Sequence, residues 1–432
     1  MKEDTKKIFL KTFGCQMNER DSEWMLGALI GAGWSLTNKA EDSDLVIINT
    51  CSVRYHAEHR AISFLGSLRK LKEKNGFKIV LTGCTAEVYR EELLKRYSYL
   101  DGIFGPSQED ELIENIGKIL EGKRMSAVGK QDGLKCFYKD SDYRKRSLSA
   151  FVSIMEGCDN FCTYCIVPYT RGRERSRAKE EVLDEIKSLK DRGCKEITLL
   201  GQNVSSYQNG GFVKLLEDID KTGIDRVRFM TSHPKDSNGD LFKAIRDLKG
   251  LCNHLHLPLQ SGSDRILKLM NRKYDLPGYL NLVDSYREFN PFGAITTDII
   301  VGFPGENLED FTATHSALKR IEFDSAFVFK YSLRPETKAA VLLDDVLGED
   351  KKKRNNILLK TQKEIVSKKK RTLVGRLAEV LFEVEDESGY SFGRSSENYT
   401  IKVQGKGLVG SIKDVKIIEI INNNLVGEIV EG

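Results

Sequence analysis

The sequence predicts an α/β protein of several domains: an open parallel α/β sheet, then a partial (β/α)6 barrel, then a small antiparallel β-barrel. Three observations carry this prediction. The first hundred or so residues alternate between buried strands and helices, and six further strand–helix units of about 30–40 residues begin near residue 147. Short strands separated by Gly, Ser and Asn then fill roughly the last 60 residues. Since 432 residues exceed one ordinary core, we expect domains at 1–125, 147–370 and 371–432, with a linker at 126–146.

The first domain contains three short, β-rich apolar segments, at residues 7–15, 43–51 and 77–84, and helical patterns such as 18–33 and 86–97. Each of the three segments ends in a cysteine: Cys15, Cys51 and Cys84. The carboxyl ends of parallel strands lie along one edge of a sheet, where ligands bind. We therefore expect the three thiols to meet in space. The alternative is a coincidence of buried structural cysteines.

The central region repeats the alternation, with helical patterns such as 178–193 and 307–323 between its strands. A polar turn containing Gly, Pro or Asn closes each expected strand, which is typical of the catalytic face of such a barrel. The six expected strands lie at 150–158, 196–203, 226–234, 254–262, 294–306 and 326–337.

The third domain is expected to hold five strands, and basic runs precede it. Residues 350–371 carry ten Lys or Arg against two acids, and two shorter basic runs lie at 143–146 and 170–179. Three such runs in one chain favour a polyanionic partner, whereas the alternative is solvated helix faces and linkers. The expected strands of the barrel are 376–386, 389–394, 399–403, 407–420 and 424–432.

The composition limits the class of protein and its compartment. Charged residues make up 31% of the chain and hydrophobic residues 40%, which is typical of a globular protein. No apolar run approaches the roughly 20 residues of a membrane span, and the N-terminal segment has no signal-peptide pattern. We expect a cytoplasmic protein without a membrane partner. The nine cysteines would stay reduced there, which favours metal binding or catalysis over disulfides.

A second group of cysteines lies within eight residues of the sequence EGCDNFCTYC: Cys158, Cys162 and Cys165. Structural zinc sites close with four ligands, and this loop offers no fourth Cys or His. Thiolates at this spacing suit a four-iron cluster, in which three ligands leave one iron open for a small molecule. Zinc stays the alternative ion, and a zinc- and RNA-binding protein without catalysis stays the alternative function.

This motif, at the end of the first strand of a predicted barrel, resembles the signature of the radical S-adenosylmethionine (SAM) enzymes. The resemblance implies a 4Fe-4S cluster whose open iron binds SAM, and an electron that cleaves SAM to a 5′-deoxyadenosyl radical. It also implies that Tyr164 lies near the adenine of SAM. The remaining residues of the SAM pocket would be Gly201, Gln202, Asn203, Gln260, Ser261 and Gly262.

Over essentially the whole chain the resemblance is to the methylthiotransferases within this superfamily. It rests on the sequences KTFGCQMNERDSE, INTCSVR and TGCTAE, on the radical SAM motif and on the terminal barrel, which resembles the RNA-binding TRAM domain. It implies that Cys15, Cys51 and Cys84 hold a second 4Fe-4S cluster, which is used in sulfur delivery. One SAM would donate a methyl group to a sulfur at that cluster, and another would yield the radical that attacks a C–H bond.

The resemblance leaves three acceptors open. The sequences TRGRERSR and RFMTSHPKD look most like the branch that adds the methylthio group to C2 of N6-isopentenyladenosine beside the anticodon of tRNA. The alternatives are N6-threonylcarbamoyladenosine in tRNA and an aspartate of a ribosomal protein. We expect the tRNA anticodon stem-loop and an electron donor such as flavodoxin or ferredoxin as partners, and a monomeric enzyme.

Several other residues carry weaker expectations. Four arginines after the cysteine motif are candidates for phosphate contacts, with ion pairs inside the domain as the alternative: Arg171, Arg173, Arg175 and Arg177. Cys136, Cys194 and Cys252 match no motif, and we interpret the last two as small buried apolar residues. His56 and His59 are expected on a helix or at the surface, and His233 receives no role. Two pairs of residues depart from the family pattern: Thr85 and Glu87, and Glu336 and Lys338.

Overall fold

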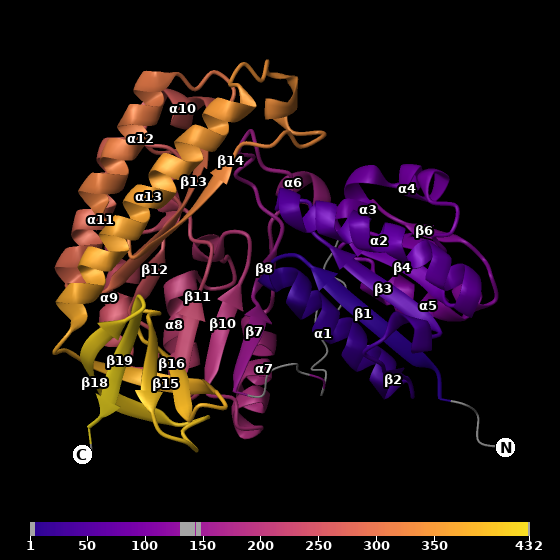
Figure 1. Ribbon diagram of the computed structural model, residues 1–432, viewed down its shortest axis with the longest axis horizontal. Coiled ribbons are helices and arrows are strands. Elements are labelled where there is room, and N and C mark those ends of the chain that lie inside the picture. The colour runs from indigo at the N-terminus through magenta and orange to yellow at the C-terminus, as the bar shows by residue number, and fades with distance from the viewer. Residues whose placement is uncertain (1–4, 130–142, 144–147, 431–432) are drawn as a thin grey trace.

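The N-terminal domain is an open sheet of six parallel strands in the order β2-β1-β3-β4-β5-β6. The computed structural model describes residues 5–129, 143 and 148–430, and Figure 1 shows three bodies along the chain. The strands are β1 Lys7–Phe13, β2 Ser35–Leu36, β3 Leu45–Thr50, β4 Lys78–Gly83, β5 Gly102–Phe104 and β6 Met125–Ala127. The helices are α1 Gln16–Gly31, η1 Ala40–Asp42, α2 Tyr55–Asn75, α3 Cys84–Tyr89, α4 Glu91–Arg96 and α5 Glu109–Leu120.

Both faces of this sheet are buried, which explains why its central strands are continuous apolar runs. In β3, Leu45 and Ile47 pack with the residues of α1 and α5, whereas Val46 and Ile48 pack with those of α2 and α3. The three predicted strands are confirmed as β1, β3 and β4. The helix predicted over 86–97 is wrong in one respect, because it divides into α3 and α4 at Arg90, whose φ is 46°.

The central domain is a partial barrel of six parallel strands, as predicted. β7, β10 and β11 form one sheet, β12, β13 and β14 form another, and a parallel bridge between Val227 and Leu251 connects them. Within the described residues, the outer edges of β7 and β14 have no strand partner, so the barrel is open on one side. These strands are β7 Ser149–Ser153, β10 Glu196–Leu200, β11 Arg226–Phe229, β12 His254–His256, β13 Ala294–Val301 and β14 Ser325–Lys330.

Helices cover the outside of this barrel and enclose the largest apolar core of the molecule. The basic segment forms the last of them, α13, which packs on β14 and α12 (Figure 1). None of the helices in the described ranges is long and apolar enough to span a membrane. The helices are α7 Lys179–Asp191, α8 Phe212–Asp220, α9 Gly239–Asp247, α10 Asp264–Leu269, α11 Leu276–Phe289, α12 Leu308–Ile321 and α13 Gly348–Leu373. Shorter elements are β8 Met155–Glu156, α6 Val167–Thr170, β9 Arg175–Ser176, η2 Val204–Ser206, η3 Pro234–Asp236 and η4 Lys338–Val341.

The C-terminal domain is a closed barrel in the order β15-β16-β17-β19-β18. Four of its pairings are antiparallel, but β17 and β19 run parallel. The prediction of a purely antiparallel barrel is wrong at this pair, because a ring with an odd number of strands cannot alternate direction throughout. The strands are β15 Leu377–Glu385, β16 Tyr390–Ser395, β17 Thr400–Gln404, β18 Ile412–Ile421 and β19 Asn424–Ile429.

This small barrel docks on the amino ends of the central strands. Arg226, the first residue of β11, donates to the carbonyl oxygens of Arg394 and Glu379, both at 2.7 Å. Arg394 in turn donates to Glu196, the first residue of β10, at 2.7 Å. Most of the expected linker 126–146, including Cys136, lies outside the described residues.

Candidate functional site

The three cysteines of the N-terminal domain come together at the carboxyl edge of its sheet. Phe13, Thr50 and Gly83, which end β1, β3 and β4, are aligned across the three adjacent strands. Cys15, Cys51 and Cys84 follow within two residues of these positions. The thiol of Cys51 donates a hydrogen bond to the sulfur of Cys15 and lowers the pKa of Cys15 to about 6. The three cysteines thus lie at one edge of the sheet, where Cys84 also acts electrostatically on Cys51.

Glycines with left-handed backbone conformations allow two of the candidate cysteines to take their places. Gly83 has φ 91°, and a Cβ atom on it would lie 2.3 Å from the carbonyl oxygen of Thr50 on the neighbouring strand. Gly157 has φ 76°, and its Cβ would lie 2.0 Å from the carbonyl oxygen of Arg173. Only glycine fits such approaches without moving the backbone. Each of these glycines directly precedes a cysteine, Cys84 or Cys158.

The second group of cysteines lies in the loop between β8 and α6, at the carboxyl end of β7. Cys158 accepts a hydrogen bond from the side-chain amide of Asn160 at 3.4 Å, and Cys162 accepts one from Arg272 at 3.3 Å. Burial raises the pKa of Cys158 and raises that of Cys165 to about 12. A bound metal would replace these protons, because the thiolate is the form that ligates metals.

The donor sets fit iron–sulfur clusters better than single metal ions. All six cysteines are free thiols. Within the described ranges, no three His, Cys, Asp or Glu side chains are gathered closely enough to hold one metal ion. Zinc needs its ligands around a single atom at about 2.0–2.3 Å, whereas each thiolate of a cluster binds a different iron. Both cysteine groups offer free thiols, which are the donors that iron–sulfur clusters take.

Buried polar atoms without partners mark a third feature, at the carboxyl ends of β10 and β11. Buried polar groups are normally hydrogen-bonded, so these unpartnered atoms leave hydrogen-bonding capacity for a polar ligand. The residues fit SAM, which carries an amino group, a carboxylate and an adenosine. Among the described residues, the unpartnered atoms after these two strands belong to Gln202, Asn203, Ser205, Ser232 and His233, and Asn160 of the cysteine loop carries another.

The residues predicted for the SAM pocket divide into two groups. Gln202 and Asn203 each carry an unpartnered side-chain oxygen, and the side-chain amide of Asn203 donates to Asp236 at 2.7 Å. Tyr164 packs on a small cluster with Met270 and Phe303. Gly201 approaches the side chain of Met155 behind the cysteine loop.

The second half of the predicted pocket is held largely by α12. The hydroxyl of Ser261 and the backbone N–H of Gly262 both contact the hydroxyl of Thr314 on α12, at 3.2 and 2.9 Å. Gln260 is buried, with φ 66°, and its backbone pairs with Asp298 and Ile300 of β13. The structure thus places Ser261 and Gly262 against α12, while Gln260 stays beside β13.

Arg171 joins the two cysteine groups, and sequence reasoning assigned it a different role. Its buried guanidinium contacts Asp21 of α1 at 2.7 Å and Glu156 of β8 at 2.6 Å. Its charge also opposes the increase in the pKa of Cys84 that burial causes. A phosphate contact is therefore excluded for Arg171.

The other three arginines differ from one another in burial and in their acidic partners. Arg177 is buried and contacts Glu185 at 2.6 Å, so the phosphate expectation is wrong for it as well. Arg175 contacts Glu156 at 3.2 Å. Only Arg173, with 70% of its side chain exposed, remains accessible, although it contacts Asp159 at 2.9 Å. The acidic partners at Asp21, Glu156, Asp159 and Glu185 all lie outside RGRER, so the local sequence carried no signal for these ion pairs.

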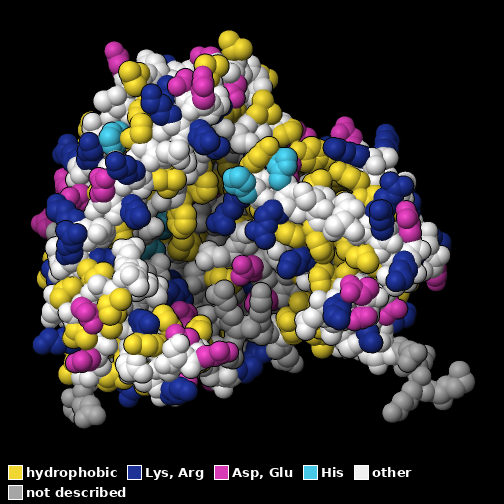
Figure 2. Space-filling model, in the orientation of Figure 1, with side chains coloured by type: hydrophobic (Ala, Val, Ile, Leu, Met, Phe, Trp, Pro, Cys, Tyr) yellow, Lys and Arg dark blue, Asp and Glu magenta, His cyan; other side chains and the backbone are white. Residues whose placement is uncertain are grey.

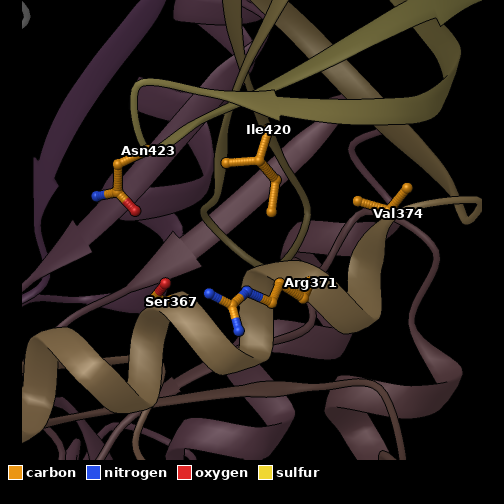
Figure 3. A pocket seen from close by; sticks show the side chains of 5 residues that line it. All are labelled: Ser367, Arg371, Val374, Ile420 and Asn423. Atoms are coloured by element: carbon orange, nitrogen blue, oxygen red, sulfur yellow. The ribbon is translucent and has the colours of Figure 1, made fainter.

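A surface pocket of about 560 Å³ lies away from the cysteines, between the end of α13 and the small barrel. In Figure 3, Ser367 and Arg371 from α13 face Ile420 and Asn423 of the barrel, and Val374 closes one end. It contains none of the residues predicted to bind a cofactor. Cys194 and Cys252 are buried, as interpreted from the sequence.

Comparison with known proteins agrees with the geometry. Residues 152–318 match the model of the radical SAM superfamily, and residues 7–105 match that of the uncharacterized protein family UPF0004. The chain is 44% identical to a tRNA-2-methylthio-N(6)-dimethylallyladenosine synthase of Thermodesulfovibrio yellowstonii, over 98% of both chains. It is 43% identical to a synthase of the same name from Acetivibrio thermocellus, over 100% of this chain and 92% of that one.

A solved structure supports the fold alone. A radical S-adenosylmethionine methyltransferase from Kitasatospora setae aligns with a TM-score of 0.58 at 16% identity, over 78% of this chain and 74% of that one. The order of α/β sheet and partial barrel is thus a known arrangement. The residue assignments rest on the geometry described above.

Proposed function

The chain belongs to the family of the tRNA-2-methylthio-N(6)-dimethylallyladenosine synthases, and from this premise we propose its reaction. It transfers a methylthio group to C2 of N6-isopentenyladenosine beside the anticodon of a tRNA. The observation that carries the proposal is the pair of three-cysteine sites on two domains that pack together through Arg171. A zinc- and RNA-binding protein without catalysis would leave the three cysteines of the N-terminal domain unexplained.

The two groups of cysteine donors would hold two clusters with different roles. Cys158, Cys162 and Cys165 would hold the cluster that binds SAM, and Cys15, Cys51 and Cys84 would hold a second cluster for sulfur delivery. When bound, the clusters and SAM supply the methyl group, the sulfur attachment and the radical that removes hydrogen from C2.

The protein itself orients these groups and excludes water from them. Gln202 and Asn203 offer unpartnered oxygens at the carboxyl end of β10, where they would accept hydrogen bonds from SAM. Tyr164 would lie against the adenine. Arg171 neutralises Asp21 and Glu156 at the contact between the domains, and this contact sets the separation of the two cysteine sites.

The partners follow from the same chemistry. The anticodon stem-loop of tRNA would bind across the small barrel and the exposed lysines of α13, among them Lys352, Lys353 and Lys360. A small electron-transfer protein such as flavodoxin or ferredoxin would reduce the clusters. We propose a monomeric enzyme of the cytoplasm.

Mass spectrometry of nucleosides from total tRNA, in cells with and without the gene, tests the proposal. The methylthio-isopentenyl nucleoside should disappear without the gene, and isopentenyladenosine should accumulate. Loss of the methylthio group from a threonylcarbamoyl nucleoside would instead overturn the proposed acceptor. If no tRNA nucleoside changes, a ribosomal-protein aspartate becomes the acceptor to examine.

Two variants sharpen this experiment. Cells that carry Cys252→Ala should regain the methylthio nucleoside, because Cys252 is a buried residue outside both sites. Cells that carry Cys158→Ala should not regain it. Recovery with Cys158→Ala would contradict the role of this loop.

A further inference from the structure

Two phenylalanines on the last strand of the central barrel are unusually exposed for residues of a strand beside a core. On β14, Ala326 and Val328 pack on the main apolar core, and the side-chain amide of Asn355 on α13 donates to the carbonyl of Val328. Phe327 and Phe329 alternate with them and point to the opposite face. They remain 50% and 40% exposed.

The register of the sheet shows which face this is. Phe327 lies opposite Asp298 on β13, and Phe329 lies opposite Ile300. Residues in register on neighbouring strands share a face. Asp298 lies 3.4 Å from His256 of β12 across the inside of the barrel, and Ile300 packs on the same small cluster as Tyr164. The two rings therefore line the lumen, beside the predicted SAM site.

The lumen is accessible from the open side of the barrel. β14 has no strand partner on its outer edge among the described residues, and it lies on the side of the central domain that faces the N-terminal domain in Figure 1. Figure 2 shows a hollow at this position, with hydrophobic side chains on the wall that the central domain forms. A planar group could enter here and lie against both rings.

We infer that Phe327 and Phe329 form the subsite for the adenine ring and its N6-isopentenyl group. This inference rests on the proposed function and adds a specificity element to it. Flat aromatic rings stack on bases that are turned out of an RNA loop, and the five-carbon substituent needs an apolar wall. The carboxylate of Asp298 shares this face, so a substituent that carries its own carboxylate would be repelled.

Such a subsite would also direct the reaction. C2 and C6 of adenine flank the same ring nitrogen, N1. Holding the substituent on C6 against the rings therefore fixes the direction in which C2 points. The subsite would align the reacting C–H bond with the SAM site while the rest of the stem-loop is held by other contacts.

The test uses reconstituted holoenzyme and two anticodon stem-loop RNAs, one with N6-isopentenyladenosine and one with unmodified adenosine at the same position. Wild-type protein should bind the prenylated RNA more tightly. The variant Phe327→Ala/Phe329→Ala should lose about tenfold in affinity for the prenylated RNA, because the five-carbon group loses the apolar surface that it lies against. Its affinity for the unmodified RNA should change much less, and its iron content and SAM cleavage should persist.

Two further variants serve as controls. Phe292→Ala removes a ring that is 68% exposed but lies before the amino end of β13, outside the lumen, and it should leave the preference unchanged. Phe327→Leu/Phe329→Leu keeps an apolar wall without flat rings, and it should retain part of the preference.

Two different failures can be told apart. If the alanine variant keeps the wild-type preference, or loses affinity equally for both RNAs, the subsite is wrong while the proposed function stands. If wild-type holoenzyme neither prefers nor methylthiolates the prenylated RNA, the proposed function fails and the subsite fails with it.

Discussion

At the scale of single residues, removing the two cysteine groups should have different effects on iron content and on SAM cleavage. We predict that Cys15→Ala/Cys51→Ala/Cys84→Ala lowers the iron content from about eight to about four atoms per chain, since each 4Fe-4S cluster carries four irons. This variant should still cleave SAM to 5′-deoxyadenosine, because the loop of Cys158 is intact. Iron analysis and chromatography of the cleavage products check both outcomes.

The reciprocal variant and a matched control complete this test. Cys158→Ala/Cys162→Ala/Cys165→Ala should lose SAM cleavage and keep the other four irons. Cys194→Ala, which changes a buried cysteine outside both sites, should keep all of the iron. If both triple variants lost all iron, the two sites would not be independent.

His233 provides a prediction about pH. It is buried at the end of β11, where desolvation and the nearby Arg272 lower its pKa from 6.5 to about 2. The unfolded chain takes up a proton below pH 6.5 that the folded protein excludes. The contribution of His233 to stability is therefore complete above pH 6.5 and declines as the pH falls toward 2, by up to about 1.4 kcal/mol per pH unit.

A variant without a titratable side chain at position 233 isolates the contribution of His233 to the pH dependence of stability. In His233→Asn, the side-chain oxygen can still accept the hydrogen bond that the backbone N–H of Lys235 donates to His233. We expect the Tm of the anaerobic holoprotein to fall less between pH 7 and pH 5.5 in this variant than in the wild type. His254, whose pKa is also lowered by burial, is present in both proteins and cancels. Equal pH dependence would contradict the assigned cause.

Local sequence predicted the cysteines well but not their neighbours. Cys15, Cys51 and Cys84 could be predicted because each ends an apolar run, and strand ends align in a parallel sheet. The role of Arg171 could not, because Asp21 lies 150 residues away in another domain. Phe327 and Phe329 look like core residues in sequence, and only the register with β13 shows that they face the lumen.

At the scale of elements, the contact of α1, α6 and β8 holds the two cysteine sites together. Arg171 follows α6 and lies between the carboxylates of Asp21 and Glu156, all three of them buried. Removing one partner of a buried ion pair costs about 3–5 kcal/mol, because the other charges stay buried without compensation. We predict that Arg171→Met lowers the Tm of the holoprotein by several degrees, as measured by calorimetry.

A neighbouring arginine gives the control for this prediction. Arg173 lies two residues further along the chain, and its side chain is 70% exposed. Exposed ion pairs contribute about 0–1 kcal/mol, so Arg173→Met should leave the Tm nearly unchanged. Similar losses in both variants would indicate that the buried position of Arg171 does not matter.

The elements themselves were largely predictable from periodicity, and the exceptions have physical causes. β5 and β6 have only three residues each, which is too short for a pattern. The helix over 86–97 breaks at Arg90 although its apolar spacing continues. Arg90 lies 3.7 Å from Glu87 and 3.6 Å from Glu336 of the central domain. Glu87 and Glu336, which both depart from the family pattern, thus both approach Arg90.

At the scale of the whole molecule, the candidate site and the small C-terminal barrel lie at opposite ends of the central domain. The cysteine loop and the unpartnered polar side chains after β10 and β11 lie at the carboxyl ends of its strands, and the small barrel contacts the amino ends through Arg226 and Glu196. An RNA that contacts the barrel must therefore extend along the central domain to place a base in the lumen. The N-terminal domain forms the other side of the hollow in Figure 2.

The relative position of the N-terminal and central domains should therefore control transfer but not SAM cleavage. Arg334, in the segment after β14, reaches across to the N-terminal domain and donates to Glu58 and to the carbonyl of Val53, both at 3.1 Å. Glu58 also accepts from Tyr89 at 2.6 Å. The guanidinium and the carboxylate are both nearly buried, so this contact fixes the N-terminal domain against the segment that follows β14.

We predict that Arg334→Met keeps its iron content and still produces 5′-deoxyadenosine, but yields several-fold less methylthiolated RNA per SAM cleaved. The reason is that each site stays intact while their separation is no longer fixed, and small displacements of reacting groups are costly. The ratio of the two products, measured in single-turnover reactions with the prenylated stem-loop, checks this outcome. Arg320→Met changes an exposed arginine on α12 far from the domain contact and should keep the wild-type ratio. A parallel decline of both products in Arg334→Met would mean that Arg334 supports the SAM site itself, and the two domains would then act as one catalytic unit.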